Sequence, residues 1–123
     1  MSHLTGKQVL AIVTNYGVEQ DELLEPVRLQ APAVSVVEAF TSSGRPVAAI
    51  CHGPWALVEA GKVSGARLTS YPSLATDVRN AGGTWVDEAV VRDTGAGYPL
   101  ITSRTPKDLP DFLRELDAVL EAR

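Results

Sequence analysis

The residues best suited to catalysis are the adjacent Cys51 and His52, which Gly53 and Pro54 follow directly. Cys51 is the single cysteine of the chain, and it separates an apolar run from a segment that begins like a helix. A side chain at such a turn projects clear of the sheet, and the first-turn amides and the helix dipole favour a thiolate. Gly53 permits close backbone approach. The pattern predicts a nucleophile elbow at Cys51, although a lone cysteine is more often buried and inert.

His52 and Glu19 are the candidate proton carriers. His52 is next to Cys51, but side chains of sequence neighbours usually diverge, so His52 could equally be a turn residue. Glu19 follows the first apolar run, on the rim expected for Cys51, yet the helix dipole alone also explains an acidic residue there. The amides of His52 and Gly53 are the candidate oxyanion donors. Cys51 and His52 have no partners at metal-ligand spacing, so we expect neither a metal nor another cofactor.

For Cys51, His52 and Glu19 to lie together, the strands that precede them must end at the same edge of one sheet. Apolar runs predict strands at 8–14, 47–50 and 67–70, with 8–14 as a central strand. Extended segments at 85–91 and 100–103 predict an antiparallel hairpin with its tip at 95–97. Helices are expected from residue 19, over 32–43, 55–60, 72–82 and 108–122. The alternation predicts a single α/β domain, residues 1–123, built as a three-layer sandwich around a mostly parallel sheet.

Apolar and aromatic side chains indicate the expected core. The last helix carries one apolar stripe at helical spacing, which we expect to face the core: Leu109, Phe112, Leu113, Leu116, Val119 and Leu120. The larger aromatic residues are expected in the core or at an interface rather than around a substrate: Trp55, Tyr71, Trp85 and Phe112.

The composition excludes several classes of protein. Hydrophobic residues make up 45% and charged residues 21%, as in an ordinary globular domain. The net charge of -4 and scattered arginines argue against nucleic acid as a partner. The amino terminus lacks the apolar core of a signal peptide, and no apolar run approaches a membrane-spanning length. One unpaired cysteine fits a reducing compartment, so we expect a cytoplasmic protein without a membrane partner.

Five motifs occur in order along the chain: AICHGP at 49–54, LTSYPS at 68–73, NAG at 80–82, WVDE at 85–88 and TSRTPKDLP at 102–110. Together they resemble the PfpI intracellular-protease and glyoxalase family of the ThiJ/PfpI superfamily, over residues 7–26 and 28–123. The resemblance implies a class I glutamine amidotransferase-like, flavodoxin-like fold and kinship with the Parkinsonism-associated protein deglycase. It also implies Cys51 as nucleophile, His52 beside it, and a protonated Glu19 hydrogen-bonded to the thiolate.

A central block of that family has no counterpart near residues 26–31. In the family this block carries a glycine pair that contributes an oxyanion-hole amide and, in peptidases, the acidic partner of the histidine. A complete βαβ rhythm also places a strand between residues 14 and 47. Loss of a strand beside the nucleophile strand would leave unpaired backbone groups within the sheet, each costing about 1–3 kcal/mol. Either the block is truly deleted and the site is incomplete, or the sequence joins two ordered parts of a longer chain. We favour the second explanation and therefore predict a spatial break between Glu25 and Pro32.

The main functional hypothesis is a cysteine-dependent enzyme that acts on reactive dicarbonyls. It would convert methylglyoxal to lactate without glutathione, or reverse early glycation, with Glu19 and His52 moving protons. The alternatives are a cysteine peptidase of the PfpI type and a redox-sensing stress protein in which Cys51 oxidises to a sulfinic acid. The expected partners are thus a small carbonyl compound or a peptide, and the resemblance adds a homo-oligomer, either a dimer or a hexamer.

Overall fold

A computed structural model of the chain describes residues 8–12 and 31–122. Strands and helices alternate through most of this part of the chain. Their bounds are β1 (Leu10–Ile12), α2 (Ala31–Ser42), β2 (Val47–Ile50), α3 (Pro54–Glu59), β3 (Arg67–Leu68), the 3-10 helix η2 (Pro72–Leu74), α4 (Ala75–Asn80), β4 (Thr84–Trp85), β5 (Val90–Asp93), β6 (Leu100–Ser103), the 3-10 helix η3 (Pro106–Asp108) and α5 (Leu109–Glu121).

The main sheet has four strands in the order β1-β2-β6-β5. The first three run parallel, and β5 pairs antiparallel with β6 as the C-terminal hairpin. Every residue of β2 and β6 is buried, as continuous apolar runs in a parallel sheet require. β3 and β4 form a separate parallel pair. The predicted mostly parallel α/β fold with its antiparallel hairpin is confirmed.

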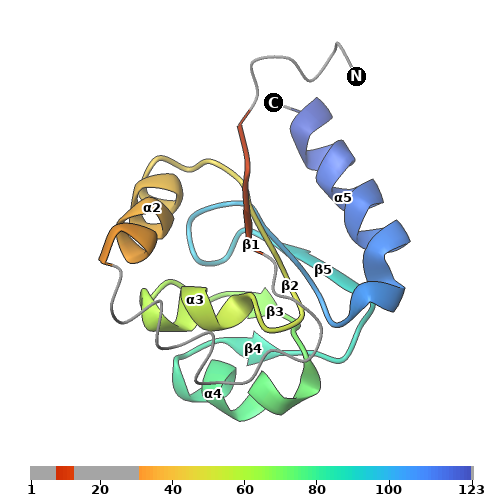
Figure 1. The fold of residues 1–123 in the computed structure, drawn as a ribbon, viewed down its shortest axis with the longest axis horizontal. Helices are drawn as coiled ribbons and strands as arrows, with labels where there is room; N and C mark the ends of the chain where they lie inside the picture. Colours follow the sequence, from red (N-terminus) through yellow and green to blue (C-terminus); the bar gives the residue numbers. More distant parts are fainter. Residues whose placement is uncertain (1–7, 13–30, 123) are drawn as a thin grey trace.

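Helices cover both faces of the sheet, as Figure 1 shows with α2 and α3 on one side and α5 on the other. Alternate residues of β2 divide between two buried clusters. Val47 and Ala49 pack with Val37 of α2 and Leu57 of α3, whereas Ala48 and Ile50 belong to a cluster that includes Phe112 of α5. The three-layer arrangement is thus confirmed. None of the helices in the described ranges is long and apolar enough to cross a bilayer.

Several predicted elements are wrong in detail. Within the described part of the sheet, β1 lies at the edge rather than in the centre, because an apolar run reports burial of faces and not the number of neighbouring strands. Segment 85–91 is not one strand: Trp85 ends β4, which pairs with β3, and β5 starts at Val90. β3 is also shorter than predicted. On α5, Leu109 and Leu113 are exposed, since only part of the apolar stripe faces the sheet.

The predicted break between Glu25 and Pro32, like the helix expected from residue 19, lies outside the described residues. The argument used for the break is wrong, however. β2 pairs with β1 on one side and with β6 on the other, so the strand that precedes Cys51 has neighbours on both sides without any additional strand. A strand absent from this chain would therefore leave no unpaired backbone beside β2.

Candidate active site

Cys51 directly follows β2 and has a left-handed backbone, with φ of 62°. It is the only non-glycine residue with positive φ in the part of the chain that the structure describes. That conformation costs about 1–2 kcal/mol for a residue with a Cβ. Two hydrogen bonds hold it: the Cys51 amide donates to the Ser103 carbonyl over 3.1 Å, and the Tyr71 amide donates to the Cys51 carbonyl over 2.8 Å. The predicted sharp turn is confirmed, and such strain is concentrated at functional sites.

Gly53 and Pro54 explain why α3 begins directly after the turn. A Cβ at Gly53 would clash with the backbone carbonyl of Ile12 and crowd that of Ile50. Pro54 suits the first turn of a helix, where its missing N–H needs no acceptor. The Gly53 amide donates to the Ile50 carbonyl over 2.9 Å. That hydrogen is used within the turn in this conformation, and the predicted role of the Gly53 amide as an oxyanion donor stays a prediction.

The second predicted oxyanion donor, the His52 amide, meets no backbone acceptor within residues 8–12 and 31–122. Its role stays a prediction. Glu19 lies outside the described residues, so its predicted contact with the sulfur stays a prediction as well. Among the described residues, no group of three or more His, Cys, Asp or Glu side chains could hold a metal ion.

The His52 ring lies beside the sulfur rather than diverging from it. His52 Nδ1 is 3.2 Å from Cys51 Sγ, within hydrogen-bonding range for sulfur. The ring stacks on Tyr71, with ring centres 4.6 Å apart and planes 23° apart. The Trp55 ring lies on another side, 5.4 Å away. Burial lowers the pKa of His52 below its ordinary value, so the neutral imidazole predominates at pH 7 and can accept the thiol proton.

Tyr71 is a site residue that the sequence interpretation missed. It was expected in the core or at an interface, yet it is 40% exposed and contacts the Cys51–His52 pair through both its amide and its ring. The available signal was its position: Tyr71 follows β3, just before the proline that opens η2. Trp55, by contrast, is buried as predicted, and its indole N–H donates to Asp77 over 2.9 Å.

Comparison with known proteins gives a consistent result. Residues 21–118 match the model of the DJ-1/PfpI family. A deglycase from Pyrococcus horikoshii is 44% identical over 97 residues, which are 79% of this chain and 56% of that protein. Protein/nucleic acid deglycase 2 of Escherichia coli is 45% identical over 89 residues, 72% of this chain and 50% of that protein. General stress protein 18 of Bacillus subtilis is 44% identical over 88 residues, 72% and 49% of the two chains.

Solved structures agree with the curated relatives. The two-domain protein from Anabaena variabilis with DJ-1/ThiJ/PfpI-like and ferritin-like domains has a TM-score of 0.74 and 34% identity, covering 89% of this chain and 29% of that one. Drosophila melanogaster DJ-1beta has a TM-score of 0.72 and 29% identity, covering 92% and 57%. The chain spans about half the length of the curated relatives that it matches. With the match of the family model and these identities, the chain belongs to the DJ-1/PfpI family.

Proposed function

We propose that this protein is a cysteine-dependent enzyme that acts on reactive dicarbonyls, converting methylglyoxal to lactate without glutathione or reversing the early adducts of such aldehydes. The observation that carries the proposal is the 3.2 Å contact between Cys51 Sγ and His52 Nδ1 at a strained turn. Relatives named deglycases support this class of substrate. Because the chain spans about half the length of these relatives, activity of the chain by itself is part of the proposal.

The reaction needs one nucleophile and a series of proton transfers. Cys51 sulfur forms a bond to the aldehyde carbon, and His52 passes the thiol proton to the carbonyl oxygen, giving a hemithioacetal. A base then removes the hydrogen from the former aldehyde carbon, and a proton is returned to the adjacent carbon. The hydroxyl proton of the former aldehyde carbon moves to the neighbouring ketone oxygen, which leaves a lactoyl thioester. Water breaks the carbon–sulfur bond and releases lactate with the thiol restored. Methylglyoxal and one water are consumed for each lactate formed, and we assign the carbon-to-carbon proton transfer to His52 and Glu19.

The exposure of Cys51 favours a small carbonyl compound over a polypeptide. Only 7% of Cys51 is accessible, so a peptide carbonyl would have to displace part of the surrounding chain before the sulfur could attack it. Peptide cleavage also requires a histidine oriented by a further group to protonate the leaving amine. Addition to an aldehyde requires only a thiolate and a proton carrier, which the Cys51–His52 contact supplies.

Lactate formation from methylglyoxal, measured without glutathione, tests the proposal. The purified chain is first checked by intact mass, and Cys51→Ser is compared with Ser73→Ala, an exposed hydroxyl in η2. We expect turnover in the wild type and in Ser73→Ala, and none in Cys51→Ser. Turnover that persists in Cys51→Ser would contradict the proposed nucleophile. Cysteine-dependent cleavage of a peptide, without any lactate, would replace the proposal with peptidase chemistry.

A further inference from the structure

We propose that the 69–71 segment positions the Cys51–His52 pair, and that Thr102 and Trp85, which anchor this segment, control the reactivity of the thiol without touching the substrate. The inference rests on the proposed function only in taking Cys51 as the nucleophile. It makes no use of the identity of the substrate. Thr102 and Trp85 are thus positioning residues, and they lie on two strands, β6 and β4.

The segment contacts both members of the reactive pair through one residue. The Tyr71 amide donates to the carbonyl of Cys51 over 2.8 Å, and the Tyr71 ring stacks on the His52 ring at 4.6 Å. The first contact fixes the backbone that carries the sulfur, and the second fixes the plane of the imidazole. A displacement of Tyr71 would therefore change the distance between sulfur and Nδ1 from both sides.

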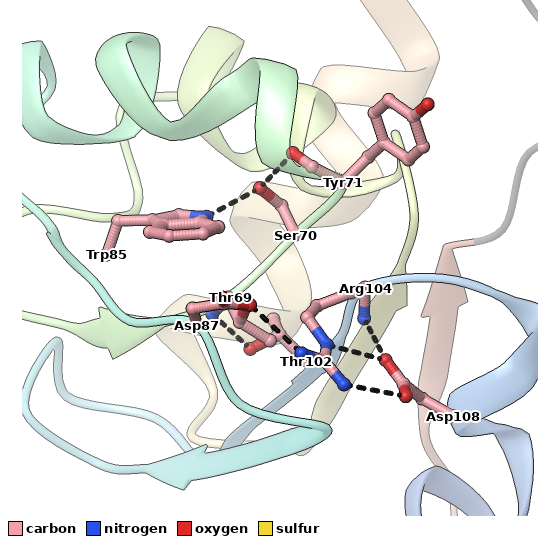
Figure 2. Close-up of polar contacts among 8 residues, drawn as sticks. All are labelled: Thr69, Ser70, Tyr71, Trp85, Asp87, Thr102, Arg104 and Asp108. Carbon is pink, nitrogen blue, oxygen red and sulfur yellow. Dashed lines mark hydrogen bonds and ion pairs between the residues drawn. The ribbon is translucent and has the colours of Figure 1, made fainter.

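Each residue of the segment is itself held by a hydrogen bond, as Figure 2 shows. The Thr69 amide donates to Thr102 Oγ1 over 2.9 Å, and the Trp85 indole N–H donates to Ser70 Oγ over 2.9 Å. Ser70 Oγ in turn donates to the Tyr71 carbonyl over 2.9 Å. Thr69, Ser70 and Thr102 are fully buried. The two anchors hence connect β6 of the main sheet and β4 of the β3–β4 pair to the reactive pair, through one buried hydrogen bond at Thr69 and two partly buried ones at Ser70.

Thr102 and Trp85 matter because the strained backbone of Cys51 needs support from its surroundings. A left-handed residue with a Cβ persists only where its surroundings leave it no alternative. β6 holds the Cys51 amide through the Ser103 carbonyl, whereas the 69–71 segment holds the Cys51 carbonyl. Thr102 precedes Ser103 on β6 and also accepts from Thr69. One strand thus supports both sides of the turn, and loss of the Thr102 hydroxyl would release one of them.

Alkylation of Cys51 by iodoacetamide tests this positioning independently of any substrate, since the chain has a single cysteine. We compare Thr102→Val, which keeps the shape and removes the acceptor, with Thr102→Ser, which restores a hydroxyl. Trp85→Phe removes the indole donor together with one ring of the indole but keeps an aromatic side chain, and it serves as the second variant if Thr102→Val does not fold. Thr41→Val is the matched control: Thr41 is a buried threonine on α2 whose hydroxyl donates to the Val37 carbonyl over 2.9 Å.

The wild type should show a step in alkylation rate below pH 6.5 that reports His52. In Thr102→Val and Trp85→Phe we expect this step to disappear and the rate at pH 7 to fall about fivefold to tenfold, as the loss of one hydrogen bond allows. Thr102→Ser and Thr41→Val should keep the step. An unchanged profile in the anchor variants would overturn the proposal, as would a uniform rise at every pH, which greater exposure alone would produce. Absence of lactate formation with these alkylation differences intact would refute the proposed function and leave the positioning standing.

Discussion

Cys51 and Arg104 occupy equivalent places at the ends of neighbouring parallel strands, but the structure treats them in opposite ways. Ile50 of β2 is in register with Ser103 of β6, so Cys51 and Arg104 are the next residues on each strand. Among the described residues, the contacts around Cys51 are uncharged: backbone hydrogen bonds, a thiol–imidazole contact and ring stacking. Around Arg104 they are ionic, and the guanidinium contacts two carboxylates.

The Arg104 cluster, consisting of Arg104, Asp87 and Asp108, is a set of charge-assisted hydrogen bonds (Figure 2). The guanidinium donates to both oxygens of Asp108, from Nε over 3.0 Å and from Nη2 over 3.1 Å, and to Asp87 over 2.9 Å. The Arg104 amide also donates to Asp108 over 3.0 Å. These hydrogen bonds, which Arg104 donates to Asp108 and Asp87, raise the pKa of Arg104 above its ordinary value. This cluster joins the end of β6 to the start of α5 and to the β4–β5 connection.

The two adjacent strand ends differ in how burial and charge set the pKa values of their side chains. Burial opposes ionisation of Asp108, but its hydrogen bonds with Arg104 outweigh that effect and lower its pKa. At His52, no charged side chain among the described residues counteracts the effect of burial. Burial therefore lowers the pKa of the imidazole, and the ring stays neutral. The ionic cluster therefore holds the strand end through charge, while the adjacent turn keeps an uncharged base beside the sulfur.

The largest expected loss of stability comes from a substitution at Gly53, on the uncharged side that carries Cys51. Gly53→Ala places a methyl group against the backbone carbonyls of Ile12 and Ile50, which cannot rotate away as a side chain could. We expect a loss of about 3 kcal/mol in the free energy of unfolding, measured by urea denaturation. Gly44→Ala is the control: Gly44 has φ of 74° with open space around its Cβ position, so only the left-handed penalty of about 1–2 kcal/mol applies. Equal losses in the two variants would contradict the steric argument.

Asp108→Asn removes one carboxylate from the Arg104 cluster, and the expected loss of stability is smaller and depends on pH. We expect a loss of about 1.5–3 kcal/mol at pH 7, the range for a hydrogen bond to a charged group. Because the pKa of Asp108 is lowered in the folded state, its contribution is complete above its unfolded pKa of about 4 and declines as the pH falls through the folded pKa. Urea denaturation of both proteins from pH 7 down to pH 3 measures this difference.

Asp111→Asn is the matched control for the ionic cluster. The Asp111–Arg114 pair is more exposed, with side-chain exposures of 42% and 71%, and pairs of this kind contribute about 0–1 kcal/mol. A difference between wild type and Asp108→Asn that stays constant down to pH 3 would show that the carboxylate charge of Asp108 contributes nothing to stability.

The turn at Cys51 could be predicted because its signals are local. Gly53 and Pro54 mark the start of a helix, and four consecutive apolar residues before Cys51 mark a buried strand. The sequence also predicted α5, whose Phe112 and Val119 are buried. Motif and periodicity reasoning performs well where a residue's conformation depends on its near neighbours in the chain.

The remainder of the site depends on contacts between residues far apart in sequence. Thr69 meets Thr102 across 33 positions and Arg104 meets Asp87 across 17, and no periodicity encodes such pairings. Tyr71 was expected in the core or at an interface, and its 40% exposure contradicts only the first of these. The apolar run at 8–14 likewise did not reveal that β1 lies at the edge of the described sheet, with Ala11 exposed and its two neighbours only partly buried.

The smallest expected effect is a lowered titration midpoint of His52. This measurement tests most directly whether the Cys51 side is uncharged while the Arg104 side is ionic. Burial lowers the pKa of His52, so its imidazole should titrate with a midpoint below 6.5 in NMR spectra recorded from pH 4 to pH 8. The only other histidine is His3, and His3→Gln leaves a single signal to follow. Asp108→Asn should leave the midpoint where it is, because the charge of Asp108 is paired with Arg104. A midpoint above 6.5 would mean that a nearby negative charge outweighs burial, and the uncharged description of the Cys51 side would then be wrong.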